Sequence, residues 1–220
     1  MKLEIQQTSD GSQTIYSDKF NETYHSVNGA ITESNHVFIR NGLHLVEKPN
    51  INILEIGFGT GLNALLTLDY SIERNRSVFY RSIELYPLEK ETYSRLSYNK
   101  DVSYATHEQF LKLHECPWNQ DFGITDLFTL HKANIDILVA QFVSAGYDLI
   151  YFDAFSPNQQ PELWSLDIFR KVFDASNQGA VLTTYCAKGA VRRNLKEAGF
   201  MVERLPGPPG KREMLRAVKH

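Results

Sequence analysis

One carboxylate and three closely spaced glycines are the clearest candidates for chemistry. Glu55 lies in an apolar, β-branched run that starts at Ile51, and Gly57, Gly59 and Gly61 follow at alternate positions. Glycine accepts positive φ and lets the backbone approach a ligand, so such a turn between a strand and a helix favours nucleotide binding. The carboxylate repels phosphate and attracts a cation. The pattern therefore indicates a positively charged ligand, since a dinucleotide would need Gly-x-Gly-x-x-Gly for its pyrophosphate.

The spacing E-x-G-x-G-x-G resembles motif I of the S-adenosylmethionine-dependent methyltransferases, whose cofactor carries an ammonium and a sulfonium but no phosphate. On this interpretation the three glycines frame the methionine part of the cofactor, and Glu55 lies near its ammonium. Glu84 ends a second predicted strand, where a carboxylate can accept both ribose hydroxyls. Asn134 or Asp136, after the third strand, meets the adenine amino group, although a helix N-cap is an equal alternative for either residue.

Asp153 is the candidate for chemistry on the acceptor. It ends a fourth predicted strand, residues 147–153, at the point where the strand order of a doubly wound sheet reverses. The polar, proline-marked residues 154–164 follow, and an acceptor is expected there. A carboxylate can hydrogen-bond an ammonium and assist its deprotonation, which an amine needs before it attacks a methyl group. We therefore expect Asp153 to act on an amine held in line with the cofactor.

Alternating strand and helix patterns must position these side chains. Apolar runs without helical period predict buried strands, and runs between glycine and proline signals predict helices. Strands are predicted over residues 51–56, 77–84, 126–132, 147–153, 179–185, 200–205 and 212–218. Helices are predicted over residues 31–45, 62–70, 107–114, 137–143, 161–173 and 188–198, with another starting near Pro87. With a hairpin over residues 3–16, this order predicts an α/β fold: a Rossmann-like, class I methyltransferase sheet with an N-terminal hairpin extension.

Length, charge and cysteine content suit one soluble domain. The 220 residues carry a net charge of −3, which gives no overall nucleic-acid signature. Nine basic and three acidic side chains after residue 187 leave +6 at the C-terminal end, which suits a polyanion or, equally, an ordinary basic surface helix. Two cysteines form neither a metal cluster nor a disulfide framework, and no run is apolar enough to span a membrane. We expect a cytoplasmic protein with one domain, in which residues 1–48 pack on a core of residues 49–220.

Longer motifs resemble the methyltransferase domain of the MnmC family over nearly the whole chain. The matching segments are residues 24–26 with Glu33 and residues 37–38, then residues 55–63, 153–157, 161–164, 184–185, 191–193, 198–200 and 211–214. The segment from Asp153 to Trp164 and the ending Lys211-Arg-Glu-Met are the most specific. The resemblance implies a class I methyltransferase fold. It also implies methyl transfer from S-adenosylmethionine to 5-aminomethyl-2-thiouridine at the tRNA wobble position.

Further residues complete the predicted site. The resemblance implies that Tyr24 closes over the cofactor carboxylate and that Asn63 belongs to the cofactor motif. The carbonyl of Phe155 is a candidate second acceptor for the amine. The expected substrate-binding residues are Pro157 in the loop, Tyr185 as a stacking partner of the flipped uracil, and Arg192, Arg193, Lys211 and Arg212 at the phosphates. Phe155 and Trp164 are also candidates for stacking, but core packing is the stronger alternative for both, and Arg212 can pair with Glu213 instead.

The better-known members of this family fuse the domain to a flavin-dependent oxidase that removes a carboxymethyl group. Because the sequence ends at His220, soon after the last predicted strand, we expect methyl transfer only, with no FAD and no metal. A separate enzyme would then supply the aminomethyl substrate. Two positions depart from the family pattern: Gln159 or Gln160 stands where relatives often carry lysine, and Asn134 stands where an acid is usual.

Two alternatives belong to other functional classes. A small-amine transferase of the spermidine-synthase type also combines an N-terminal hairpin, a glycine turn and an aspartate near the fourth strand. The absence of a second acid directly beside Asp153 counts against it. A noncatalytic RNA-binding protein could keep the same fold, but the intact Glu55, Glu84 and Asp153 count against loss of the site. Binding of S-adenosylmethionine and transfer to polyamines would separate the three hypotheses.

Overall fold

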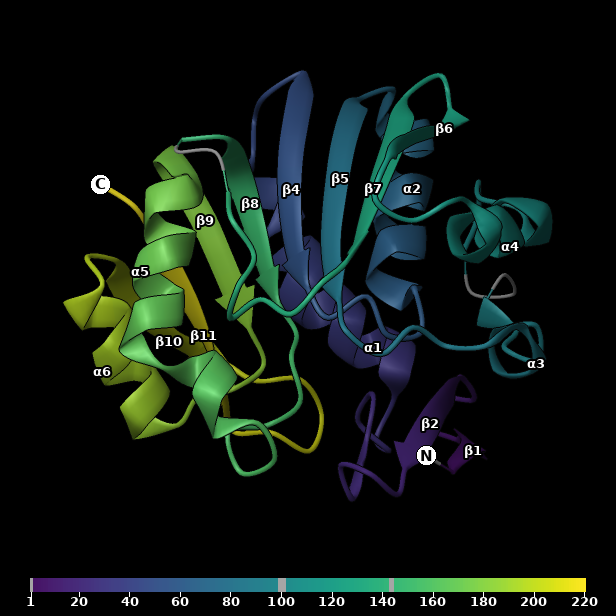
Figure 1. The fold of residues 1–220 in the computed structure, drawn as a ribbon, viewed down its shortest axis with the longest axis horizontal. Helices are drawn as coiled ribbons and strands as arrows, with labels where there is room; N and C mark the ends of the chain where they lie inside the picture. The colour runs from purple at the N-terminus through teal and green to yellow at the C-terminus, as the bar shows by residue number, and fades with distance from the viewer. Residues whose placement is uncertain (1, 99–101, 143–144) are drawn as a thin grey trace.

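The computed structural model describes residues 2–98, 102–142 and 145–220, which contain one large sheet and one small sheet. Among these residues, eight strands form the large sheet in the order β10-β11-β9-β8-β4-β5-β7-β6. Their bounds are β4 Asn50–Ile56, β5 Ser77–Glu84, β6 Asp121–Thr125, β7 Phe128–Asn134, β8 Tyr147–Phe152, β9 Ser176–Thr184, β10 Met201–Pro206 and β11 Glu213–Val218. The small sheet holds β1 Leu3–Gln7, β2 Gln13–Ser17 and β3 Glu22–Thr23, and it lies below the central strands in Figure 1.

The centre of the large sheet is parallel, and its strand order reverses between β4 and β8. β4 pairs with β5 on one side and with β8 on the other, and β5 and β8 continue to β7 and β9. This is the doubly wound order expected from the sequence, in which ligands bind at the carboxyl ends beside the reversal. Gly57, Glu84 and Asp153 therefore come to the same edge, toward which the arrowheads of these strands point in Figure 1.

Helices cover both faces of the parallel strands. The helices and single turns are α1 Ala30–Ser34, η1 Asn35–Arg40, η2 Leu43–Leu45, α2 Leu62–Arg74, α3 Lys90–Tyr93, α4 His107–Glu115, η4 Pro161–Trp164, α5 Leu166–Ala175 and α6 Gly189–Glu197. In β4, Ile51 and Ile53 join the cluster that contains residues of η1 and α2, whereas Leu54 and Ile56 join the cluster of α5 and α6. Apolar side chains thus point to both faces of β4, which is why the strand has no helical period.

Two predicted helices in the second half of the chain differ from the structure, and one observed strand was not predicted. Residues 136–142 contain a single turn in place of the first helix: the Val139 and Ala140 amides donate to the Asp136 carbonyl, and the Leu138 amide donates to the Asp136 side chain at 2.9 Å. Val143, where that helix was predicted to end, lies outside the described residues. The predicted helix over 161–173 is split into η4 and α5 by the extended Ser165. The edge strand β6 was not predicted, since its exposed and half-buried residues lack the apolar pattern of the inner strands.

The predicted N-terminal hairpin is confirmed as β1 and β2, and β3 adds a third strand to it. The predicted helix over 31–45 is shorter and irregular: α1 passes into the π-helix η1, which ends at the Asn41-Gly42 stop, and η2 follows. Val37 and Phe38 of η1 are buried in the main core. The N-terminal segment is thus anchored to the large sheet, and its residues 22–27 reach the carboxyl edge of the strands.

Candidate active site

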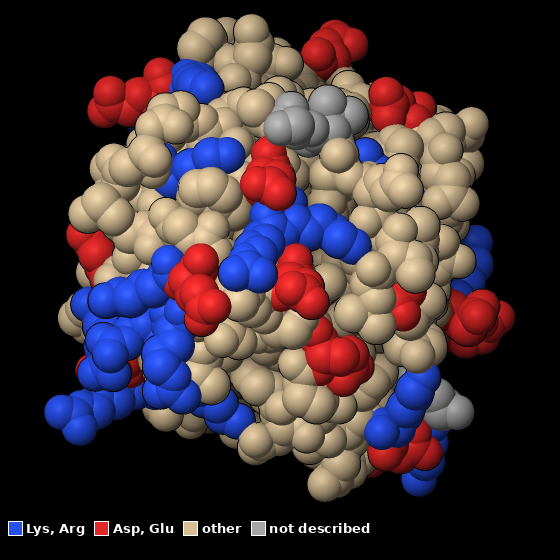
Figure 2. Space-filling view, turned by 60° about the vertical axis from the view of Figure 1, so that its left-hand side comes forward, with Lys and Arg blue, Asp and Glu red and all other residues tan. Residues whose placement is uncertain are grey.

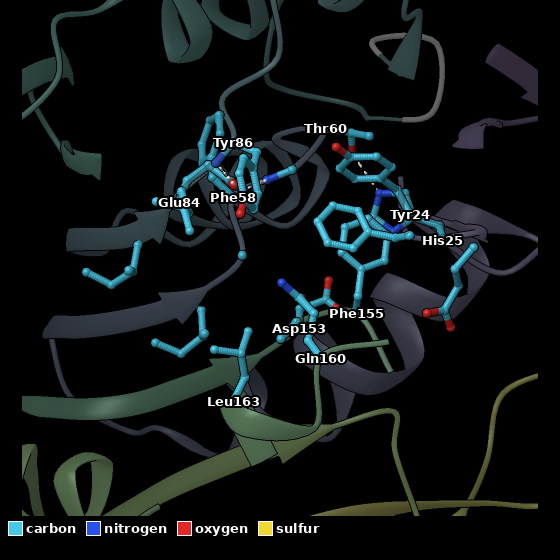
Figure 3. A pocket seen from close by; sticks show the side chains of 18 of the residues that line it. Tyr24, His25, Phe58, Thr60, Glu84, Tyr86, Asp153, Phe155, Gln160 and Leu163 are labelled. Atoms are coloured by element: carbon cyan, nitrogen blue, oxygen red, sulfur yellow. Dashed lines mark hydrogen bonds between the residues drawn. The ribbon is translucent and has the colours of Figure 1, made fainter. Parts of the chain in front are cut away.

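A cavity of about 360 Å³ lies at the carboxyl ends of β4, β5, β7 and β8. Figure 3 shows Tyr24, Glu84 and Asp153 around it. The predicted site residues that line the cavity are Tyr24, Gly57, Gly59, Glu84, Asp153, Phe155, Tyr185 and Lys211. The predicted site residues outside the described lining are Glu55, Gly61, Asn63, Asn134, Pro157, Arg192, Arg193 and Arg212. The structure therefore brings together the glycine turn, two carboxylates and the aromatic residues around the strand ends.

The glycine turn leaves no room for side chains. Gly57 has φ 95°, and a Cβ atom there would lie 2.7 Å from the Asp153 carbonyl oxygen. Gly59 has φ 50°, and its Cβ would lie 3.0 Å from the Tyr24 ring. Gly61, at φ 72°, starts α2 instead of lining the cavity. The turn thus exposes backbone to the cavity, which is what close approach of a ligand requires.

Glu84 is held at the edge of the cavity by backbone amides. Its Oε2 accepts the Gly59 amide at 2.9 Å and its Oε1 accepts the Tyr86 amide at 2.7 Å, as the dashed lines of Figure 3 show. Burial raises the pKa of Glu84, and the backbone hydrogen bonds act in the opposite direction. The carboxylate keeps acceptor capacity toward the cavity, as a ribose diol requires.

Glu55 and Asn63 act behind the cavity wall. Asn63 Nδ2 donates to Glu55 Oε1 at 3.2 Å and to Asp153 Oδ2 at 2.8 Å, and Ser82 Oγ donates to Glu55 Oε2 at 2.7 Å. Burial raises the pKa of Glu55 to about 8. Glu55 is fully buried and lies outside the described lining, so it acts through Asn63. The sequence predicts Glu55 beside the ligand ammonium; in the structure its oxygens accept from Asn63 and Ser82, behind the described lining of the cavity.

Asp153 presents a carboxylate at the point where the strand order reverses. Burial, and then the charge of Glu33, raise the pKa of Asp153 to about 7, while the Asn63 hydrogen bond and the charge of Lys211 lower it. Among the described residues, only Asn63 donates a hydrogen bond to this carboxylate. A carboxyl group with a pKa near neutrality and one open oxygen is suited to accept a proton from a bound cation.

The segment after β8 is fixed by two large side chains. Trp164 Nε1 donates to the Phe155 carbonyl at 2.8 Å, and Tyr185 Oη donates to the Ala154 carbonyl at 2.8 Å. The Phe155 ring stacks on Phe20 with the ring centroids 4.2 Å apart. The carbonyl expected to receive the amine is therefore already engaged by Trp164. The sequence predicts Trp164 in the core, where it is buried, but no sequence pattern indicates the hydrogen bond that its N–H donates.

Lys211 points into the cavity and pairs with Glu33. Its Nζ lies 2.5 Å from Glu33 Oε1 and 3.9 Å from the centroid of the Tyr185 ring. Lys211 was predicted to contact phosphate, and Tyr185 was predicted to stack on a base. In the structure the Lys211 ammonium pairs with Glu33 and lies over the Tyr185 ring, and the phosphate contact and the base stacking stay predictions. Glu33 belongs to a motif noted in the sequence, but no role was assigned to it.

Acidic side chains dominate the cavity. Its described lining contains one basic side chain, Lys211, and six acidic ones: Glu22, Glu33, Glu84, Asp136, Asp153 and Glu162. His25 lines the cavity too, but burial lowers the pKa of His25 to about 4, so its ring is uncharged at pH 7. Such a lining attracts cations and repels phosphate. The excess of acids explains why the cavity suits a ligand with ammonium and sulfonium groups.

The remaining predicted residues lie away from the cavity. Asn134 Nδ2 donates to the Glu84 carbonyl at 2.9 Å and so connects β7 to β5. Of the two candidates for the adenine contact, Asp136 lines the cavity and Asn134 does not. Arg193 and Arg212 are exposed, and Arg192 is half-buried with its Nε enclosed. Figure 2 shows basic side chains gathered at lower left, on the side of the molecule that carries α6, β10 and β11.

The described residues contain no group of three or more His, Cys, Asp or Glu side chains that could hold a metal ion. Within the same residues, no helix has both the length and the apolar character needed to cross a membrane.

Comparisons with known proteins agree with this geometry. A sequence model of a family described as S-adenosyl-L-methionine-dependent methyltransferase matches residues 97–220. The tRNA 5-methylaminomethyl-2-thiouridine biosynthesis bifunctional protein MnmC of Cupriavidus metallidurans is 34% identical, over 94% of this chain and 32% of that protein. The protein of the same name from Nitrosospira multiformis is 35% identical, over 91% of this chain and 34% of that protein. The chain thus spans about a third of the length of these relatives.

Solved structures confirm the predicted fold class. MNMC2 from Aquifex aeolicus superimposes with a TM-score of 0.80 at 28% identity, over 98% of this chain and 70% of that chain. Spermidine synthase from Thermotoga maritima gives a TM-score of 0.64 at 17% identity, over 99% and 69%, which indicates a shared fold alone. The family match over residues 97–220 covers more than half of the chain, and the glycine turn and acidic cavity fit its cofactor. The chain therefore belongs to this family of S-adenosyl-L-methionine-dependent methyltransferases.

Proposed function

We propose that this methyltransferase modifies tRNA by transferring a methyl group to the amine of 5-aminomethyl-2-thiouridine at the wobble position. The observation that carries the proposal is the position of Asp153, a carboxylate with an open oxygen at the strand-order reversal of an acidic cavity. The names of the relatives, which refer to 5-methylaminomethyl-2-thiouridine biosynthesis, support the choice of acceptor.

The residues at the ends of β4 and β5 suit the cofactor. When bound, S-adenosylmethionine supplies a methyl group attached to a positively charged sulfur. The cofactor end of the cavity consists of Gly57, Gly59, Glu84 and Tyr86: the turn offers backbone to the methionine part, and Glu84 accepts the ribose hydroxyls. Asp136, at the cavity beyond β7, is the better placed candidate for the adenine amino group. Tyr24 covers the turn from the N-terminal segment, as its contact with Gly59 supports.

The acceptor end of the cavity consists of Asp153, Glu33, Lys211 and Tyr185. An aminomethyl group is protonated near neutral pH and needs to lose a proton before its nitrogen lone pair can attack. Asp153 binds the ammonium through its open oxygen, accepts the proton and holds the nitrogen toward the methyl group. Trp164 and Tyr185 keep the backbone of residues 154–155 in place, so the Asp153 side chain has a fixed position.

Exposed basic residues support RNA binding outside the acidic cavity. Arg193 and Arg212 are exposed, and the basic side chains of Figure 2 gather on the side that carries α6 and the β10–β11 hairpin. Phosphate contacts of this kind position RNA without reading its sequence. The target uridine would leave its stack to enter the cavity. The bifunctional name of the relatives further supports an upstream activity, on the same or a separate chain, that supplies the aminomethyl group.

The proposal is tested by methyl transfer from labelled S-adenosylmethionine to three acceptors. These are tRNA bearing 5-aminomethyl-2-thiouridine, the same tRNA bearing the carboxymethylated amine, and free polyamines. We expect transfer to the aminomethyl tRNA and none to the others. Transfer to polyamines alone would replace the proposed acceptor by a small amine, and the absence of any transfer despite cofactor binding would favour a noncatalytic RNA-binding role.

A further inference from the structure

The acceptor end contains two carboxylates, and the protein itself occupies one of them. Glu33 Oε2 accepts the Ser26 amide at 2.8 Å, and Glu33 Oε1 lies 2.5 Å from the Lys211 ammonium. The side chain of Glu33 is 8% exposed and that of Lys211 is 30% exposed. Glu33 is thus held by one hydrogen bond and one ion pair within the chain, and its carboxylate is buried, where charges interact more strongly than in bulk water.

Lys211 takes the position that an ammonium of a ligand would take. Its Nζ lies between the Glu33 carboxylate and the face of the Tyr185 ring, 3.9 Å from the ring centroid. A carboxylate and an aromatic face are the two groups that bind organic ammonium ions. Asp153, in contrast, receives a hydrogen bond from Asn63 alone among the described residues and keeps one oxygen open.

We propose that Lys211 determines acceptor specificity: by neutralising the Glu33 carboxylate, it removes the second negative charge beside Asp153, so the site takes an acceptor with one ammonium in preference to a diamine. This inference rests on the proposed transfer to an amine. It explains how an acidic cavity on a fold shared with spermidine synthase selects against polyamines. Two other acids line the cavity on this side: Glu22 accepts the Ser156 amide at 3.1 Å through one oxygen, and Glu162 is exposed to water, which screens its charge.

The pair also joins two distant segments across the cavity. Glu33 belongs to α1, whereas Lys211 belongs to the turn between β10 and β11. A loss of amine selectivity after substitution must therefore be separated from a loss of this connection. The double variant Glu33→Gln/Lys211→Met removes both charges together and leaves no buried unpaired charge, so it serves as the matched control. Lys211→Arg keeps the positive charge and is the second control.

The test is calorimetric titration of putrescine and of butylamine, its monoamine counterpart, into the protein loaded with S-adenosylhomocysteine. We expect the wild type and Lys211→Arg to bind the two amines with similar affinity. In Lys211→Met the released Glu33 should favour putrescine over butylamine by about tenfold. The double variant should return to similar affinities. An unchanged ratio in folded Lys211→Met, or a tenfold preference for putrescine in the wild type, would overturn the proposal.

A second variant keeps the inference testable if Lys211→Met does not fold. In Glu33→Gln, Lys211 loses its partner, and its charge repels an ammonium at Asp153. Butylamine should then bind about tenfold more weakly than to the wild type, and unchanged affinity would contradict the inference. Because these titrations contain no tRNA, they separate the two proposals. A shifted ratio without methyl transfer to tRNA would refute only the RNA acceptor, and transfer to tRNA with an unshifted ratio would refute only the role of Lys211.

Discussion

The cofactor end of the cavity is built mainly from backbone, whereas the acceptor end is built from side chains that come from distant parts of the chain. At the cofactor end, Glu84 is fixed by two backbone amides, one from the glycine turn after β4 and one from the residues that follow β5. At the acceptor end, Glu33, Asp153 and Lys211 come from three segments that are far apart in the sequence. A backbone-built site tolerates few changes at its glycines, while a side-chain-built site can change its specificity by single substitutions.

The largest effect on the cofactor end is expected for Gly57→Ala. The new Cβ would lie 2.7 Å from the Asp153 carbonyl oxygen, in a residue with φ 95°. We expect cofactor binding to weaken about 100-fold, equivalent to about 2.8 kcal/mol, as measured by calorimetric titration of S-adenosylmethionine. Gly179→Ala is the matched control, because Gly179 has φ 78° but no atom within 4 Å of its Cβ position. It should lose about 1–2 kcal/mol of stability and retain cofactor affinity. Equal affinities for the two variants would contradict a cofactor role for the turn.

A smaller effect on the same end is expected for Glu84→Gln. The amide oxygen can still accept one backbone N–H, but the second contact and the charge toward the ribose are lost. We expect cofactor affinity to fall about tenfold and the rate at saturating cofactor to change little. Glu89→Gln, an exposed substitution outside the described cavity lining, should leave both quantities unchanged. A fall in the rate at saturating cofactor, with unchanged cofactor affinity, would indicate that Glu84 acts on the acceptor instead of the cofactor.

A third prediction concerns the pH dependence of stability, through Glu55 behind both ends of the cavity. Burial raises the pKa of Glu55 to about 8 from an ordinary value of 4.5, so unfolding releases a proton between these pH values. The contribution of Glu55 to stability therefore falls as pH rises, by at most about 1.4 kcal/mol per pH unit. In urea unfolding, Glu55→Gln should gain stability relative to the wild type from pH 5 to pH 8. Glu4→Gln, on an exposed site, should show a flat difference. A flat difference for Glu55→Gln would mean that its carboxyl group is ionised in the folded protein.

The parallel core was predictable because the central strands are short, rich in apolar residues and without a helical period, a pattern typical of strands buried on both faces. β5 coincides with its prediction at residues 77–84, and the carboxyl ends of such strands fix the positions of Glu84 and Asp153. β6 was missed because it is a partly exposed edge strand. The helix predicted after Asp136 was wrong: hydrogen bonds from the following amides to the Asp136 carbonyl and side chain form a single turn there.

The acceptor end was less predictable for a physical reason. A pair such as Glu33 and Lys211 depends on how α1 and the β10–β11 turn meet in space, and no local pattern encodes that contact. The same holds for Trp164, whose burial follows from its apolar ring but whose N–H partner, the Phe155 carbonyl, depends on the split between η4 and α5. Sequence motifs identify which residues belong to such a site, but the tertiary structure decides which of them are open to a ligand.

The most direct test of the account compares Asp153→Asn with the wild type for both methyl transfer to aminomethyl tRNA and binding of S-adenosylmethionine. The variant keeps an oxygen that can accept from Asn63, but it cannot take a proton. We expect the single-turnover rate to fall about 100-fold or more, with cofactor affinity changed by less than about threefold. Because the pKa of Asp153 is raised to about 7, the wild-type kcat/KM should rise with pH through that value, and the variant should lose this limb. Two results would contradict the assignment of Asp153 to the acceptor. One is a loss of cofactor affinity as large as the loss of rate, and the other is a variant with the wild-type rate and the same rise of kcat/KM with pH.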